Sequence, residues 1–135
     1  MVSIAPKHVL MILTSIVLGS FGQISLKHGM ATSHIKLSGD VIDKIQALII
    51  VIFTRPYVTV GFALYGASAL LWLVILKNVQ LSFAYPMIAL SYVLVTFLSW
   101  LIFREHVNWI SVTGLFFICC GVALVGVGLG RTAAQ

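Results

Sequence analysis

The chain alternates long apolar blocks with short polar stretches. Four blocks cover about residues 9–27, 57–76, 81–103 and 109–129. Each is close to the roughly 20 residues that an α-helix needs to cross a hydrocarbon core of about 30 Å. We therefore predict an all-α membrane protein with four transmembrane helices, which form a single four-span domain over residues 1–135. The connections after the second and third spans are short, so spans two, three and four are expected to be antiparallel neighbours.

A shorter segment, about residues 41–53, has a different pattern. Its apolar side follows helical spacing through Ile42, Ile45, Ile49 and Ile52. The other side carries Asp43 and Lys44. A short helix with this asymmetry favours the plane of the interface over a transmembrane position. Arg55-Pro56 ends it, because proline disfavours helix in the preceding residue and suits the first turn of a new helix.

Composition supports the membrane class and narrows the alternatives. Only 8% of the residues are charged and 61% are apolar, whereas soluble domains carry about 25% charged residues. The formal charge of +5 is spread thinly and forms no basic patch, so nucleic-acid binding is not expected. Cationic residues are nearly balanced between the two sides of the membrane. This gives a weak preference for an outside N-terminus and is compatible with insertion in both orientations.

The sequence shows no arrangement typical of an enzyme. It contains no phosphate-binding loop. The histidines lack the spacing of zinc ligands: His8, His28, His34 and His106. The three acidic residues, Asp40, Asp43 and Glu105, fall outside the predicted spans. Cys119 and Cys120 are adjacent within the last span and are interpreted as packing residues. We predict a protein that is not an enzyme and that has no metal site and no cofactor.

Three spans nevertheless carry polar and small residues on one helical face. In span one these residues are Ser20, Gln23 and Lys27. In span two they are Gly61, Tyr65, Ser68 and Trp72. In span three they are Ser82, Tyr85, Ala89, Tyr92, Thr96 and Ser99. Polar groups lack partners in lipid, so these faces are expected to turn inward. They either hold helices together or line a cavity, and the bulky aromatic rings favour a cavity.

Lys27 is the most informative charged residue. It lies near the end of span one, where its stem could simply carry the ammonium group to the lipid headgroups. Alternatively, Lys27 and Gln23, one turn apart, offer a charge and hydrogen-bond donors to an anionic group. Arg55 and Arg104 would add anion contacts at the membrane surface, or serve only as interfacial anchors. Glu105 belongs to the same rim.

Span four has a different face. Gly114, Gly121 and Gly128 repeat every seven residues without polar companions. A smooth glycine face lets two backbones approach closely, which favours a protein–protein contact, with packing inside the monomer as the alternative. In span three, Pro86 removes a backbone donor and predicts a kink.

These residues resemble the drug/metabolite transporter superfamily, specifically its four-helix, EamA-like members. The resemblance rests on "GSFGQISLKHG", "SFAYPMIALSYVLVTFLSWLIFREHV" and "GLFFICCGVALVG", and covers nearly the whole chain. In the small multidrug resistance transporters the pattern matched by Gly114 and Gly121 is a dimer contact, which implies the same role here. Those exporters have a glutamate eight residues before the position of Lys27, where this chain has Gly19, and a tryptophan where it has Ile88.

The motifs are more similar to those of the flippase subunits for undecaprenyl-phosphate-linked aminoarabinose. These proteins share the Tyr85-Pro86 motif, the Gln23/Lys27 ending of span one and a glutamate after span three, here Glu105. The resemblance implies a dimer, of two copies or with a paralogue, in the bacterial inner membrane. This dimer would move an anionic or lipid-linked substrate across the membrane. The expected site contains Ser20, Gln23, Lys27, Tyr65, Tyr85 and Tyr92.

Two other functions remain open from the sequence. One is a small multidrug or cation exporter with a different coupling residue. The other is a non-transporting membrane subunit that assists a glycosyltransferase. Membrane lipid is an expected partner in every case.

Overall fold

The computed structural model describes residues 6–33 and 40–132, the last four of these as backbone only. Its helices are α1 (Pro6–Ala31), α2 (Val41–Thr54), α3 (Pro56–Asn78), α4 (Leu81–Ile88), α5 (Leu90–Phe103) and α6 (Trp109–Thr132). Four helical stretches are long and apolar enough to cross a membrane: α1, α3, α4 with α5, and α6 up to Gly128. The protein is an all-α membrane protein with four candidate spans, as the hydrophobic pattern predicted.

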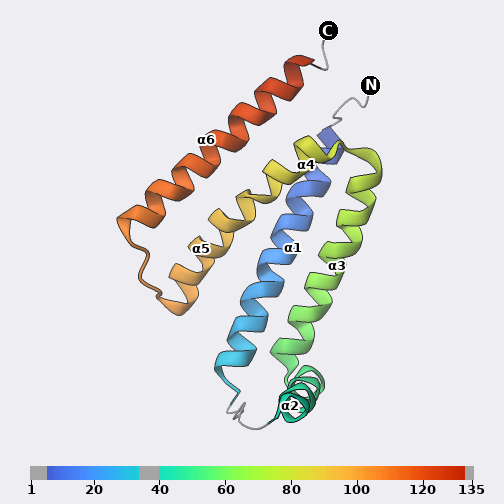
Figure 1. Ribbon diagram of the computed structural model, residues 1–135, viewed down its shortest axis with the longest axis vertical. Coiled ribbons are helices and arrows are strands. Elements are labelled where there is room, and N and C mark those ends of the chain that lie inside the picture. Colours follow the sequence, from blue (N-terminus) through green and yellow to red (C-terminus); the bar gives the residue numbers. More distant parts are fainter. Residues whose placement is uncertain (1–5, 34–39, 133–135) are drawn as a thin grey trace.

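The helix α2 lies across the N-terminal end of α3. Figure 1 shows it almost end-on while the spans run along the page. The backbone N–H of Asp40, its N-cap, donates to Asp43 Oδ2 at 3.2 Å, and Pro56 occupies the first turn of α3. Among the other described helices, α2 packs only on α3. An orientation across the spans is the one that an interfacial helix requires.

The helices α1 and α3 form the closest pair in the described structure (Figure 1). Small residues allow this approach. A Cβ atom built on Gly61 of α3 would lie 2.9 Å from both the Gly22 carbonyl oxygen and the Leu26 nitrogen of α1. Hydroxyl groups add direct bonds: Ser68 Oγ donates to the Ser15 carbonyl oxygen at 2.8 Å, and Ser15 Oγ lies 3.1 Å from the Ser68 carbonyl oxygen.

The main hydrophobic cluster lies at the opposite end of the molecule from α2. It joins α1, the end of α3 and α4 through Ile12, Ile16, Ile75, Val79, Phe83 and Ala84. Val79 of the α3–α4 connection belongs to this cluster, so the packing holds the start of the third span in place.

The third span is interrupted at Ala89. Pro86 lies inside α4, and the Ala89 N–H donates to the Pro86 carbonyl oxygen at 3.1 Å, a tighter turn than that of an α-helix. The chain resumes as α5 from Leu90. The predicted kink therefore occurs three residues after the proline.

The helix α6 lies on the far side of α4 and α5 and stands apart from α1 and α3 (Figure 1). Within the described chain it packs on α4 and α5 and on no other helix. Span two meets span three only near their connection. Spans three and four are therefore neighbours as expected, whereas span two packs mainly on span one, because the small residues of α1 and α3 allow a closer approach.

Candidate functional site

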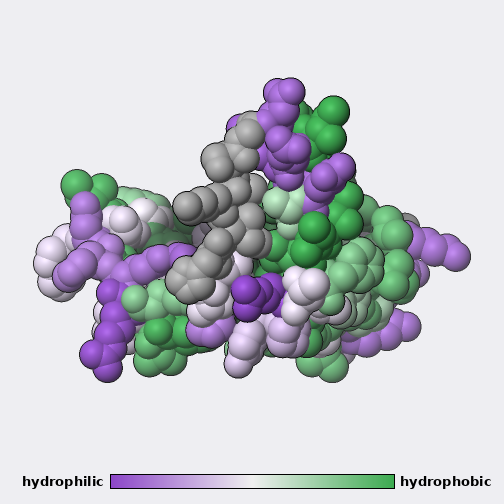
Figure 2. Space-filling view, turned by 90° about the horizontal axis from the view of Figure 1, so that it is seen from below, coloured by the Kyte–Doolittle hydropathy of each residue, from purple (hydrophilic) through white to green (hydrophobic). Residues whose placement is uncertain are grey.

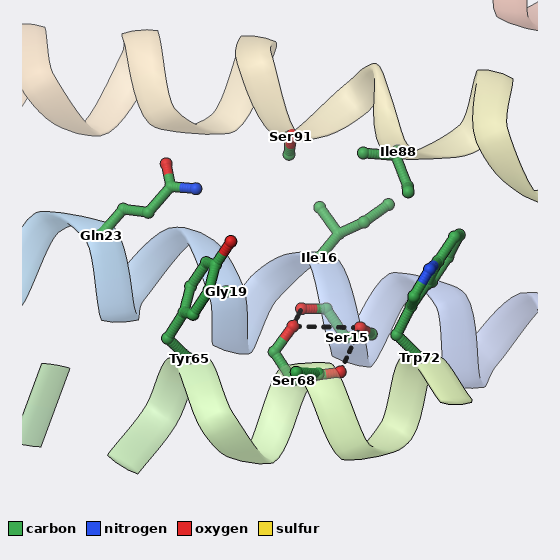
Figure 3. A pocket seen from close by; sticks show the side chains of 10 residues that line it. Ser15, Ile16, Gly19, Gln23, Tyr65, Ser68, Trp72, Ile88 and Ser91 are labelled. Carbon is green, nitrogen blue, oxygen red and sulfur yellow. Dashed lines mark hydrogen bonds between the residues drawn. The ribbon is translucent and has the colours of Figure 1, made fainter. Parts of the chain in front are cut away.

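A cavity of about 260 Å³ lies between α1, α3 and the α4–α5 break (Figure 3). Its walls are Ser15, Ile16, Gly19, Gln23, Tyr65, Ser68, Ala69, Trp72, Ile88 and Ser91. Gly19 keeps the cavity open on the α1 side, since even a Cβ atom there would lie 3.0 Å from Ser68 Oγ. None of the lining residues carries a charge, so the cavity is built for neutral polar groups.

The hydroxyl groups of Ser15 and Ser68 are already used between the helices, as the dashed lines in Figure 3 show. The groups left for a ligand are the amide of Gln23, the hydroxyls of Tyr65 and Ser91, and the indole N–H of Trp72. In Figure 3, Gln23 and Tyr65 both extend into the space between α1–α3 and α5. Amide and hydroxyl groups that flank aromatic rings can bind a polyhydroxy compound by hydrogen bonds and ring stacking.

Charge gathers beyond one end of this cavity, where α1 and α5 both finish. Lys27 Nζ of α1 forms an ion pair with Glu105 Oε1, which follows α5. The ammonium group also lies 4.8 Å from the centre of the Phe103 ring. Seen from this end, hydrophilic residues interrupt the hydrophobic surface (Figure 2). Both side chains of the pair remain nearly half exposed, at 46% and 45%.

Aromatic contacts hold the three helix ends around this ion pair. The His28 ring of α1 meets the Tyr57 ring of α3 edge-on at 4.9 Å, and lies 6.2 Å from Phe103 of α5. Ser25 Oγ donates to the Tyr57 carbonyl oxygen at 2.6 Å. The position of Lys27 relative to the cavity is therefore set by packing between spans rather than by one flexible side chain.

The structure distributes the predicted substrate residues over several environments. Gln23 and Tyr65 line the cavity. Ser20 is 1% exposed and lies outside the cavity, and its Oγ has no hydrogen-bond partner among the described residues. Tyr85 and Tyr92 are 58% and 63% exposed and do not line the cavity.

The rotation of the third span explains this outcome for the tyrosines. The face that it turns toward α1 carries Ile88 and Ser91. Tyr92 follows Ser91 and therefore points about 100° away around the helix. Tyr85 instead packs its ring 6.1 Å from Trp72. Thr96 of the same stripe faces α6 across a second cleft, and Ser99 is buried.

Two polar residues of the cavity, Ser15 and Ser91, were absent from the sequence prediction. Ser15 continues the Gly19 and Gln23 spacing by one more turn, so an extended stripe on α1 would have included it. No helical spacing in the sequence pointed to Ser91, because its orientation depends on the break at Ala89 and on how α5 packs.

The rim residues lie at the same end as Lys27. Arg104 ends α5 in the left-handed conformation, with φ 53°, and Glu105 follows it directly. Arg55 is exposed at the α2–α3 junction, where its carbonyl oxygen accepts a hydrogen bond from Thr59 Oγ1 at 3.2 Å. Of the histidines considered as ligands, His34 is outside the described residues, and the described residues contain no cluster suited to a metal ion.

The glycine face of α6 points away from the monomer. Gly114, Gly121 and Gly128 are all exposed. No atom lies within 4 Å of a Cβ built on Gly114 or Gly121. Packing inside the monomer, the alternative reading of this repeat, does not account for these two glycines.

A family model for EamA-like transporters matches residues 9–127. The chain belongs to the EamA-like transporter family. The match covers nearly all of the four candidate spans and every residue that lines the cavity. No solved structure matches the chain.

Curated relatives agree with the family. A probable 4-amino-4-deoxy-L-arabinose-phosphoundecaprenol flippase subunit ArnF of Shewanella sediminis is 36% identical over 86% of this chain and 85% of its own length. A probable ArnE subunit of a flippase with the same name, from Pseudomonas aeruginosa, is 39% identical over 53% of this chain and 62% of its own length. A probable ArnF subunit of Proteus mirabilis is 36% identical over 58% of this chain and 60% of its own length.

Proposed function

We propose that this chain is a subunit of a dimeric flippase that moves a polyprenyl-phosphate-linked sugar across the bacterial inner membrane. One observation carries the proposal. A neutral cavity with hydrogen-bonding and aromatic walls reaches Gln23, and Lys27 follows one turn later on the same helix, about 6 Å along its axis. A sugar joined to a lipid phosphate matches this arrangement, because it places neutral hydroxyl groups next to an anionic phosphate.

Each part of such a substrate has a matching environment. The phosphate is anionic and is bound by the Lys27 ammonium group at the end of the span. The sugar hydroxyls exchange hydrogen bonds with Gln23, Tyr65 and Ser91, and its apolar face stacks on aromatic rings. The neutral cavity binds the uncharged hydroxyl groups of the sugar, whereas a charged group of the head would need a counter-ion there and therefore stays at the rim, beside Lys27 and Glu105. The polyprenyl chain stays in the bilayer, and no covalent chemistry takes place.

Movement of the head group uses the break in the third span. Ile88 and Ser91 line the cavity on the two sides of Ala89, so a change of angle between α4 and α5 changes the cavity directly. The same break frees backbone groups beside the substrate, which is common in transporters with interrupted helices.

The dimer forms through α6. Gly114 and Gly121 present a surface without side chains, on which the backbone of another helix can pack closely. The partner is a second copy of this chain or a homologous subunit. The relatives carry the word "subunit" in their names, which supports an assembly.

Export of organic cations receives less support from the site. All three acidic residues lie outside the four candidate spans. The position that holds a glutamate in the small multidrug transporters is Gly19, where a Cβ atom would already lie 3.0 Å from Ser68 Oγ. A cation in this cavity would therefore lack a carboxylate to bind it.

Thermal unfolding of the purified protein tests the proposal. The ligands are undecaprenyl phosphate, a lipid-linked sugar and two quaternary ammonium drugs, each added to wild type and to Lys27→Ala. A ligand at about 100 times its Kd adds about 2.7 kcal/mol of stability when it binds only the folded state. We expect both lipid phosphates to raise the melting temperature of wild type and to have far less effect on Lys27→Ala.

Two results would contradict the proposal. Stabilisation by the ammonium drugs alone, unchanged in Lys27→Ala, would assign the protein to the drug exporters. If none of the ligands has an effect while Gly121→Leu on α6 still weakens the dimer, the protein is a non-transporting subunit.

A further inference from the structure

The ion pair of Lys27 and Glu105 complicates phosphate binding. Lys27 has its counter-ion within the chain, supplied by a residue 78 positions away. A phosphate that binds Lys27 must therefore compete with the Glu105 carboxylate. Because each side chain of the pair is nearly half exposed, a ligand can reach both without unfolding the site. The position of Glu105 next to a substrate ligand requires its own explanation.

We propose that the substrate exchanges partners with this ion pair, and that Glu105 selects a head group that carries an ammonium group as well as a phosphate. The inference rests on the proposed function. The phosphate replaces the Glu105 carboxylate at Lys27. The released carboxylate then binds the ammonium group of the same head group.

The charge balance at the membrane edge supports this exchange. Before binding, Lys27 and Glu105 neutralise each other. A lipid phosphate with a neutral sugar would take Lys27 from Glu105 and leave this partly exposed carboxylate only its neighbours Arg104 and His106 and water, which is less favourable. A zwitterionic head group leaves both residues paired. The amino group in the names of the relatives' substrate has the required charge at neutral pH.

The surroundings of Glu105 provide space for the ammonium group. A hollow of about 460 Å³ opens beside it, lined by Trp100, Leu101, Arg104, Glu105, His106 and Val107. Trp100 adds an aromatic ring that can contact a cation. Arg104 and His106 are the competing internal partners for a released carboxylate, so the selection for an amine is expected to be modest.

The test compares three ligands that differ in one group at a time. They are undecaprenyl phosphate, its 4-amino sugar derivative, and the N-formyl form of that derivative, in which the amine is neutral. Binding to the full-length protein in nanodiscs is measured for wild type, Glu105→Gln, Lys27→Gln and Asp43→Asn. Asp43→Asn is the matched control, since it removes an exposed carboxylate from α2 at the same end of the molecule.

We expect wild type and Asp43→Asn to bind the amino sugar lipid about fivefold more tightly than its N-formyl form, the effect of one partly exposed ion pair. Glu105→Gln removes this preference. It also increases the affinity for plain undecaprenyl phosphate severalfold, because Lys27 no longer has an internal competitor. A merely structural role for Glu105 would predict weaker binding of all three ligands instead.

The outcomes separate this inference from the proposed function. If Lys27→Gln weakens all three ligands while Glu105→Gln retains the amine preference, or weakens plain undecaprenyl phosphate, the exchange is wrong and the flippase proposal stands. If wild type binds none of the lipids, both fail. A cooperative unfolding transition of each variant without ligand shows that the variant is folded. Because both side chains of the ion pair are partly exposed, we expect only small changes in the free energy of unfolding.

Discussion

Glycine has opposite surroundings in two regions of this molecule. Where α1 crosses α3, Gly22 and Gly61 bring two backbones into contact, and no room remains for a Cβ atom. Along α6, Gly114 and Gly121 have open space on the side that faces away from the monomer. The same residue type thus consolidates one helix pair and leaves a smooth face on another. The comparison indicates that α1–α3 is the most closely packed part of the described structure, whereas the open glycine face of α6 is the surface that we propose for a protein partner.

The largest expected effect comes from adding a side-chain atom where the backbones of α1 and α3 are in contact. In Gly61→Ala the new Cβ would lie 2.9 Å from backbone atoms of Gly22 and Leu26, so the helices must separate. We expect a loss of about 1–3 kcal/mol in the free energy of unfolding, measured by denaturant titration in detergent.

Gly66→Ala is the control on the same helix. No atom lies within 4 Å of its Cβ position, so alanine is expected to stabilise the helix, by less than about 1 kcal/mol. Equal effects of the two substitutions would show that α1 and α3 do not pack as described.

The next effect concerns assembly rather than folding. Gly121→Leu on α6 is expected to change monomer stability by no more than about 0.5 kcal/mol, because the site is open. It should weaken the dimer about tenfold or more, since a leucine keeps the partner backbone at a distance. Cross-linking in nanodiscs at a series of protein-to-lipid ratios measures the dimer fraction.

Ala123→Leu serves as the comparison, because residue 123 is also exposed but lies about 200° around the helix from Gly121. We expect it to leave the dimer intact. If both variants dimerise like wild type, α6 does not form the contact.

The smallest expected effect concerns the hydrogen bonds that Ser15 and Ser68 form between α1 and α3. A double-mutant cycle with Ser15→Ala and Ser68→Ala should give a coupling energy of about 0.6 kcal/mol, typical of hydrogen bonds between membrane helices. Ser111→Ala on α6, where the side chain is exposed, should have almost no effect on unfolding. A coupling near zero would mean that the hydroxyl groups of Ser15 and Ser68 add nothing to the stability of the pair.

Several features could be predicted from the sequence because they depend on local chemistry. A bilayer requires hydrogen-bonded backbone over a fixed length, so the apolar blocks fix the spans. Arg55-Pro56 separates α2 from α3 for steric reasons that operate within a few residues. Pro86 predicts the kink in the third span in the same way. Helical spacing on α1 and α3 also identifies Gln23 and Tyr65 as partners across one cavity.

Only the tertiary structure decided how each helix is rotated and which distant residues meet. Tyr65 and Tyr92 belong to equally regular stripes, yet Tyr65 lines the cavity and Tyr92 faces outward. The rotation of α3 relative to α1 is set by Gly22 and Gly61 together, where the two backbones approach most closely. The rotation of α5 depends on the break at Ala89 and on how α5 packs on α1. The pairing of Lys27 with Glu105 depends on the same packing, because it joins the ends of two helices that only the assembled bundle brings together.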